Sequence, residues 1–199
     1  MEIKNITDFK SNKVKIEAEG VTFALYKSDL KKYDIKTGEI EDDVYNEIIK
    51  ETLPKRALDR SLKIITGRDM TEGMIKDKLK EDLYPEDIID SVIEKLKNER
   101  LINDDRFIRG FIEGKSSKKS KRDIMAALAL KRVNMDQAER IYDELSSEGS
   151  LLDEKELIIK MLEKRHFDFE NADFDEKQKQ IRYLMGKGFS FDSIHSVLK

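Results

Sequence analysis

The stretch IKDKLKEDLYPEDIIDSVIEKLKNERLIND, residues 75–104, recurs in divergent form as IMAALALKRVNMDQAERIYDELSSEGSLLD, residues 124–153. The same offset of 49 residues also aligns apolar positions before each stretch. Seven pairs of positions agree in type: Leu58 with Phe107, Leu62 with Phe111, Ile75 with Ile124, Leu79 with Leu128, Val92 with Ile141, Leu96 with Leu145 and Asp104 with Asp153. Agreement at one fixed offset indicates an internal repeat, which is typical of solenoid proteins.

The apolar positions of each copy form three groups at helical spacing. In the first copy these are Leu58 and Leu62, then Ile75 and Leu79, then Ile89, Val92, Ile93 and Leu96. Thr71 and Pro85 stand where the second and third helices would begin, because threonine caps a helix N-terminus and proline suits its first turn. A third, divergent copy covers residues 184–198 at an offset of 56. We therefore expect three tandem units of three helices.

A small β element is expected before the repeats. Val14, Ile16 and Ala18 alternate with charged residues, and Gly20 precedes a second apolar run, which predicts two strands joined by a tight turn. The expected organisation is a β-containing element with a lead helix at 1–53, then three-helix repeats at 54–104, 105–153 and 154–199. Such units bury little surface alone, so stacking them gives a mainly α, elongated and curved solenoid.

Composition excludes several classes of protein. Of the 199 residues, 41% are charged and 38% hydrophobic, with only 9 glycines and 2 prolines, which favours helices. The absence of cysteine excludes disulfides and a catalytic thiol, and two histidines leave little material for a zinc site. The longest apolar run, residues 124–130, is far shorter than the roughly 20 residues of a membrane span. We therefore expect a soluble, cytoplasmic monomer without cofactor or metal.

One segment holds the only strong positive charge. Residues 106–132 carry nine basic and two acidic side chains, although the whole chain has a formal net charge of -3. Such a local excess is typical of a surface that meets a polyanion or an acidic protein. The candidate partner-binding residues are Arg106, Arg109, Lys115, Lys118, Lys119, Lys121, Arg122, Lys131 and Arg132. The alternative is a solvated loop without a partner, because charged runs are common on protein surfaces.

The sequence contains no constellation for catalysis. Asp104 and Asp153 recur a whole repeat apart, which favours helix capping over a shared pair of acids. Residues 185–189, MGKGF, lack the spacing and the preceding strand of a phosphate-binding loop, and are interpreted as a helix-ending turn. His166 and His195 have no neighbouring partner for a metal. We therefore expect a protein that is not an enzyme.

These features resemble the RecX family over residues 54–199. The most specific stretch is residues 96–107, LKNERLINDDRF, where a helix ends, a Leu-Ile-Asn-Asp turn follows and an aromatic residue starts the next helix. Further matches are Ala57-Leu58, Gly188-Phe189-Ser190 and, as in the β-containing lead of longer members, Tyr26, Leu30, Lys36, Gly38 and Ile40. The resemblance implies a non-enzymatic helical-repeat regulator that binds the RecA recombinase filament. It also implies inhibition of RecA strand exchange, ATP hydrolysis and coprotease activity, in the control of recombination and DNA repair.

The sequence departs from the family at three glycines. The family usually has glycine near Leu83, Ser120 and Arg132, and all three are missing here. We therefore expect a different backbone path at the first of these turns and a longer or less ordered basic loop after Phe111.

Two other functions remain open. A helical-repeat DNA-binding protein would use residues 106–132 directly on phosphates, and a structural adaptor would use the repeats alone. The acidic remainder of the chain would repel bare DNA. The expected main partner is therefore the RecA filament, with single-stranded DNA as a secondary contact.

Overall fold

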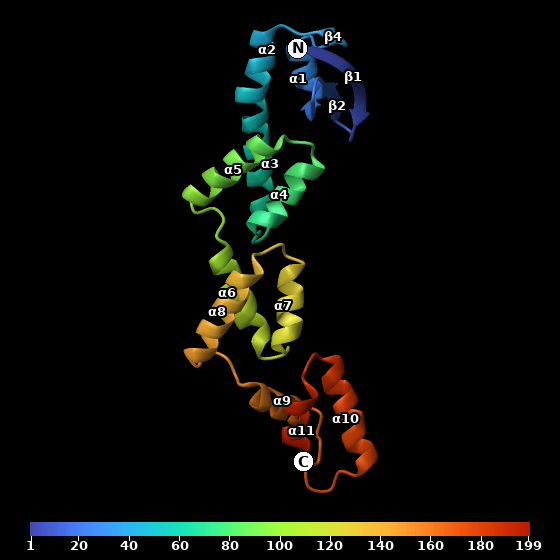
Figure 1. The fold of residues 1–199 in the computed structure, drawn as a ribbon, viewed down its shortest axis with the longest axis vertical. Coiled ribbons are helices and arrows are strands. Elements are labelled where there is room, and N and C mark those ends of the chain that lie inside the picture. The colour runs from blue at the N-terminus through green and yellow to red at the C-terminus, as the bar shows by residue number, and fades with distance from the viewer. The chain divides into compact units, whose positions relative to one another are not determined.

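The computed structural model describes residues 1–199, which divide into two compact units, Met1–Asn103 and Asp104–Lys199. A small sheet lies in the first unit, and helices make up most of both (Figure 1). The first unit has one apolar core and the second has two. The prediction of a mainly α fold of three-helix units with a small N-terminal β element is confirmed. The elongated, curved shape stays a prediction.

The N-terminal sheet has four antiparallel strands, not the two that were predicted. They are β1 Glu2–Phe9, β2 Lys13–Ala18, β3 Val21–Tyr26 and β4 Gly38–Glu39, in the order β3-β2-β1-β4. The register of β1 shifts between Ile3 and Asn5, and this irregularity lets both Ile3 and Ile6 pack on the core. Because of this shift, β1 lacks the strict alternation of apolar and polar residues by which a strand is recognised in a sequence. The short helix α1 Lys27–Lys32 follows β3 directly.

One continuous helical segment leads from the sheet into the first repeat. It comprises α2 Asp42–Glu47, the π-helical turn η1 Ile48–Thr52 and α3 Leu53–Ile65. Proline donates no N–H and its ring crowds the preceding turn, so Pro54 disturbs regular helical bonding. The wider π turn lies directly before Pro54, where it relieves this crowding. The predicted limit between residues 53 and 54 falls inside this segment, and the limits of the units stay predictions.

Two more helices, α4 Glu72–Glu81 and α5 Glu86–Asn98, complete the first three-helix group. Thr71 caps α4 as predicted, because its hydroxyl accepts the Met74 N–H at 3.1 Å. Leu62 departs from the predicted core and is 37% exposed. The fully buried positions of the group are as predicted and include Ile75, Leu79, Ile89 and Leu96.

The second unit holds two three-helix groups. Their helices are α6 Asp104–Ser116, α7 Lys121–Ala129 and α8 Met135–Ser147, then α9 Glu154–Glu163, α10 Phe174–Gly186 and α11 Phe191–Leu198. Asp153 caps α9 as predicted: its carboxylate accepts the Glu156 N–H at 2.7 Å, and the Glu156 side chain accepts the Asp153 N–H at 3.2 Å. Leu128 in one core and Leu184 in the other are fully buried.

The turn after the second helix takes the same left-handed backbone in all three repeats. Leu83, Arg132 and Gly188, equivalent at offsets of 49 and 56, have φ of 60°, 57° and 88°. The expectation of a different path at the first of these turns, at Leu83, is therefore wrong. This conformation costs a residue with a side chain roughly 1–2 kcal/mol, so the packing of the flanking helices imposes it on Leu83 and Arg132.

Candidate partner-binding surface

Five of the nine predicted basic residues lie where α6 is joined to α7. Lys115 is in the last turn of α6, Lys118 and Lys119 are in the connection, and Lys121 and Arg122 begin α7. The connection itself has only four residues, 117–120. The basic run is thus a short turn between two helices, not the longer loop that was expected.

The remaining residues are not all brought to that turn. Arg106 is near the start of α6, and Lys131 and Arg132 follow the end of α7. The two helices run in opposite senses on either side of their short connection (Figure 1). With nine residues, α7 is about 13 Å long, so these three residues lie toward the opposite end of the helix pair.

Lys121 is already paired with carboxylates of α8. Its Nζ lies 2.8 Å from Glu139 Oε2 and 3.0 Å from Asp143 Oδ1. Burial acts to lower the pKa of Lys121, but hydrogen bonds to these two carboxylates outweigh it, and the pKa is raised above its ordinary value. Lys121 therefore holds α7 to α8.

Arg109 has the same arrangement on α6. It lies 3.1 Å from Glu144 and 3.6 Å from Glu148, at the C-terminal end of α8. The sequence signal was the series of acids along α8, which was counted with the acidic remainder of the chain and not with the basic segment. Two of the nine charges are thus neutralised within the unit.

Four residues in and beside the connection have no such partner. Lys115, Lys118, Lys119 and Arg122 are exposed, and none has a carboxylate within salt-bridge distance. Together these four form what we term the basic turn. They concentrate four positive charges over eight residues of chain, and they are the part of the predicted site that is available to a partner.

Ser120 fixes the geometry of the basic turn, and sequence reasoning missed this role. The Ser120 side chain is buried, and its Oγ accepts the Asp123 N–H at 3.2 Å as the N-cap of α7. The same hydroxyl donates to the backbone oxygen of Lys187 at 2.9 Å. The available signal was Ser120 three residues before Asp123, directly ahead of the apolar run 124–130, which is typical of a helix N-terminus. One hydroxyl therefore joins the basic turn to the turn between α10 and α11.

Gly188 makes this close approach possible, so we expect Gly188→Ala to lower the free energy of unfolding by about 2–3 kcal/mol. A Cβ there would lie 2.7 Å from Asp123 Oδ1 and closer still to Ser120 Oγ. The estimate adds roughly 1–2 kcal/mol for the left-handed backbone to about 1 kcal/mol for a disturbed N-cap. Urea denaturation followed by circular dichroism measures the change.

Gly149→Ala is the matched control. Gly149 has φ of 72°, but nothing lies within 4 Å of a Cβ built there. We expect this substitution to cost only the backbone strain, roughly 1–2 kcal/mol. Equal losses at both glycines would show that the Ser120–Gly188 contact contributes nothing to stability.

Two aromatic rings beside the basic turn contact cations of this chain. Lys121 Nζ lies 4.8 Å from the centre of the Tyr142 ring. Tyr183, on α10, has the Arg165 guanidinium at 4.0 Å and Lys187 Nζ at 5.6 Å from its ring centre. Each ring is thus engaged by a cation of this chain.

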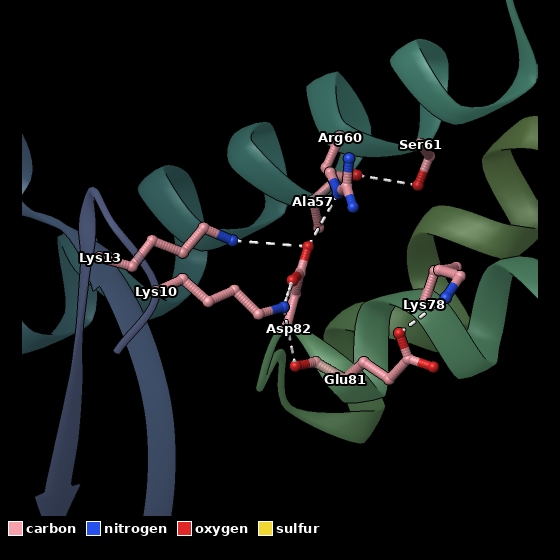
Figure 2. A network of polar contacts seen from close by, with 8 residues as sticks. All are labelled: Lys10, Lys13, Ala57, Arg60, Ser61, Lys78, Glu81 and Asp82. Carbon is pink, nitrogen blue, oxygen red and sulfur yellow. Dashed lines mark hydrogen bonds and ion pairs between the residues drawn. The ribbon is translucent and has the colours of Figure 1, made fainter. Parts of the chain in front are cut away.

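A second charged cluster joins the sheet to the first repeat (Figure 2). The carboxylate of Asp82, at the end of α4, accepts hydrogen bonds from Lys10 and, at 2.8 Å, from Arg60 Nε. Lys13 Nζ lies 3.5 Å from the same carboxylate, between the rings of Tyr26 and Tyr84 at 5.0 and 5.1 Å from their centres. The cluster has a structural role, because both Lys13 and Asp82 are buried.

The pKa shifts in this cluster arise because three cations pair with the single carboxylate of Asp82. Burial acts to raise the pKa of Asp82, but Lys10, Arg60 and Lys13 outweigh it, and the pKa is lowered. Burial lowers the pKa of Lys13, and the attraction of Asp82 does not fully offset it because the nearby positive charges of Lys10 and Arg60 lower it further. Ion pairing to Asp82 is therefore what keeps Lys13 charged inside the protein.

The structure shows no group of three or more histidine, aspartate or glutamate side chains placed to hold a metal ion. None of its helices combines the length and the apolar character needed to cross a membrane.

Curated relatives cover most of the chain. The regulatory protein RecX of Clostridium acetobutylicum is 31% identical over 173 residues, which are 84% of this chain and 79% of that protein. The regulatory protein RecX of Finegoldia magna is 30% identical over 190 residues, 92% of this chain and 91% of that protein. The chain belongs to the RecX family.

Family models locate two of the RecX domains within the chain. The first three-helix domain of RecX matches residues 57–96, and the third matches residues 153–198. A crystal structure of regulatory protein RecX has a TM-score of 0.58 at 21% identity, covering 98% of both chains. RecX from Lactobacillus salivarius has a TM-score of 0.60 at 22% identity, over 74% of this chain and 95% of that one. These two structures share the RecX fold with this chain.

Proposed function

We propose that this RecX-family protein binds the RecA recombinase filament and inhibits its strand exchange, ATP hydrolysis and coprotease activity. The basic turn carries the proposal: four exposed cations lack carboxylate partners, in a chain whose relatives are regulatory proteins. Cations held close together repel one another, and an acidic surface that covers them removes this repulsion. The proposal gives the chain no catalytic role, and its monomeric state and cytoplasmic location stay predictions.

Two rings that contact cations of the chain itself favour a protein partner over single-stranded DNA. Surfaces for single-stranded nucleic acid combine a positive groove with aromatic rings on which bases stack. Beside the basic turn, Tyr142 and Tyr183 are instead engaged by cations of the chain itself. Acidic side chains need no ring, so RecA is the proposed main partner and DNA a secondary one.

We expect a fourfold charge reversal of the basic turn to abolish inhibition of RecA. Each exposed contact that becomes repulsive costs on the order of 0.5–1 kcal/mol, and four together reduce affinity roughly 30- to 1000-fold. Lys121 is left intact because it holds α7 to α8. The measurement is DNA-dependent ATP hydrolysis by RecA, titrated with each protein. The reversed residues are Lys115, Lys118, Lys119 and Arg122.

The matched control reverses four exposed lysines of the first unit, Lys50, Lys55, Lys63 and Lys95. It changes the net charge equally, so equal loss of inhibition in both variants would contradict the assignment of the basic turn. Binding to naked single-stranded DNA at two salt concentrations tests the alternative. Four neutralised phosphates give a slope of log affinity against log salt of about -2.8. Tight binding to DNA with that slope, and none to RecA, would establish a DNA-binding protein instead.

A further inference from the structure

We propose that the partner surface continues from the basic turn into the third repeat, where Lys187 and Arg165 extend it toward a carboxylate-rich protein surface. The proposal rests on the proposed function and adds to it two binding residues outside the basic segment, together with the chemistry of the partner. Neither residue lies within residues 106–132, where the charge count of the sequence placed the site.

The first step is the direct contact between the two turns. The backbone oxygen of Lys187 accepts a hydrogen bond from Ser120 Oγ at 2.9 Å, and Ser120 directly follows Lys119 in the chain. The next residue, Gly188, packs so closely against the start of α7 that a Cβ there would displace the side chains of Ser120 and Asp123. Lys187 is exposed, while Ser120 beside it is only 2% exposed. The backbone of Lys187 therefore lies beside the basic turn, and its side chain is exposed.

The second step is the position of Arg165. Its guanidinium lies 4.0 Å from the centre of the Tyr183 ring, and its Nε donates to Gln180 Oε1 at 2.8 Å. Lys187 Nζ lies 5.6 Å from the centre of the same ring. Both cations thus contact the same ring. Neither has a carboxylate within salt-bridge distance, and the guanidinium keeps N–H groups that Gln180 does not use.

The third step concerns the partner. A guanidinium already held by stacking and by one hydrogen bond loses little freedom when it binds, and its planar N–H groups match a carboxylate. The Tyr183 ring contacts both cations of the chain itself. Acidic protein side chains are therefore the partner that we propose for the surface made of Lys118, Lys119, Arg122, Lys187 and Arg165.

The test is Lys187→Glu in the full chain, with binding to RecA filaments measured by fluorescence anisotropy at about 0.1 M salt. We expect affinity to fall about two- to fivefold, as one reversed contact predicts, and Lys187→Arg to retain it. The control is Lys50→Glu, at an exposed lysine of the first unit that is not part of the proposed surface. It changes the net charge equally, so we expect a change of less than about twofold.

The outcomes separate this inference from the proposed function. If reversal of the basic turn abolishes RecA binding while Lys187→Glu behaves like Lys50→Glu, the extension is wrong and the proposed function stands. If the wild-type chain does not bind RecA, the proposed function fails, and the surface is tested with poly-L-glutamate and with oligo(dT). Loss of poly-L-glutamate binding in Lys187→Glu would support the extended surface. Preference for oligo(dT), lost in the same variant, would overturn the partner class in favour of nucleic acid.

Discussion

Replacing Asp82 with alanine is expected to lower the free energy of unfolding of the first unit by about 3–5 kcal/mol, the cost of breaking a buried ion pair. The side chains of Lys13 and Asp82 are 6% and 4% exposed. Without Asp82, the ammonium group of Lys13 stays buried with no counter-charge. The loss should appear as a lower urea midpoint and as faster hydrogen exchange at amides of the sheet.

Lys10→Ala is the control for this cluster. Lys10 binds the same carboxylate, but its side chain is 45% exposed. We expect a loss of no more than about 1 kcal/mol, as for surface ion pairs. A loss as large as that of Asp82→Ala would mean that burial of Lys13 is not the cause.

The effect of Asp82 also depends on pH. Its pKa in the folded protein is lowered, so the stabilisation is complete above the ordinary aspartate pKa of about 4 and is lost as pH falls through the lower, folded value. The difference in stability between wild type and Asp82→Ala should therefore be constant near neutral pH and shrink below about pH 4.

Leu79→Ala and Leu128→Ala are each expected to lower the free energy of unfolding by about 2–5 kcal/mol, through lost burial and the cavity left behind. The two leucines are equivalent at the 49-residue offset, and both are fully buried, each in its own core. Denaturant midpoints of the two variants should shift alike. An unchanged midpoint in either variant would disprove the repeat alignment at that position.

Leu130→Ala is the control for Leu128→Ala. Leu130 follows by two residues but is 83% exposed, so we expect a change within about 0.5 kcal/mol. A loss equal to that of Leu128→Ala would mean that burial does not explain the effect.

The repeats could be predicted because apolar spacing reports directly on helix packing. The offset of 49 residues placed Ile75 and Ile124 in equivalent cores, and local capping chemistry located Thr71 and Asp153. Strand β1 could not be found in the same way, because its register shift breaks the alternation of period two on which strand prediction depends.

The basic surface was only partly predictable for a different reason. Counting charges along the chain located the segment, but it could not tell Lys121, which pairs with α8, from Lys119, which does not. That distinction depends on which helices pack together. The contact between Ser120 and Lys187 joins residues 67 positions apart, and no local pattern encodes a contact at such a separation.

The glycine at position 188 also bears on whether the second and third repeats are interchangeable modules. The helix capped by Ser120, in the second repeat, contacts the turn at Gly188 in the third repeat. The equivalent turn of the second repeat has Arg132 in place of the glycine. An arginine side chain at position 188 would occupy the space that Ser120 and Asp123 now fill. The residues at this contact therefore fix the order of the two repeats. If the repeats were duplicated or exchanged, Ser120, Asp123 and Gly188 would have to change together.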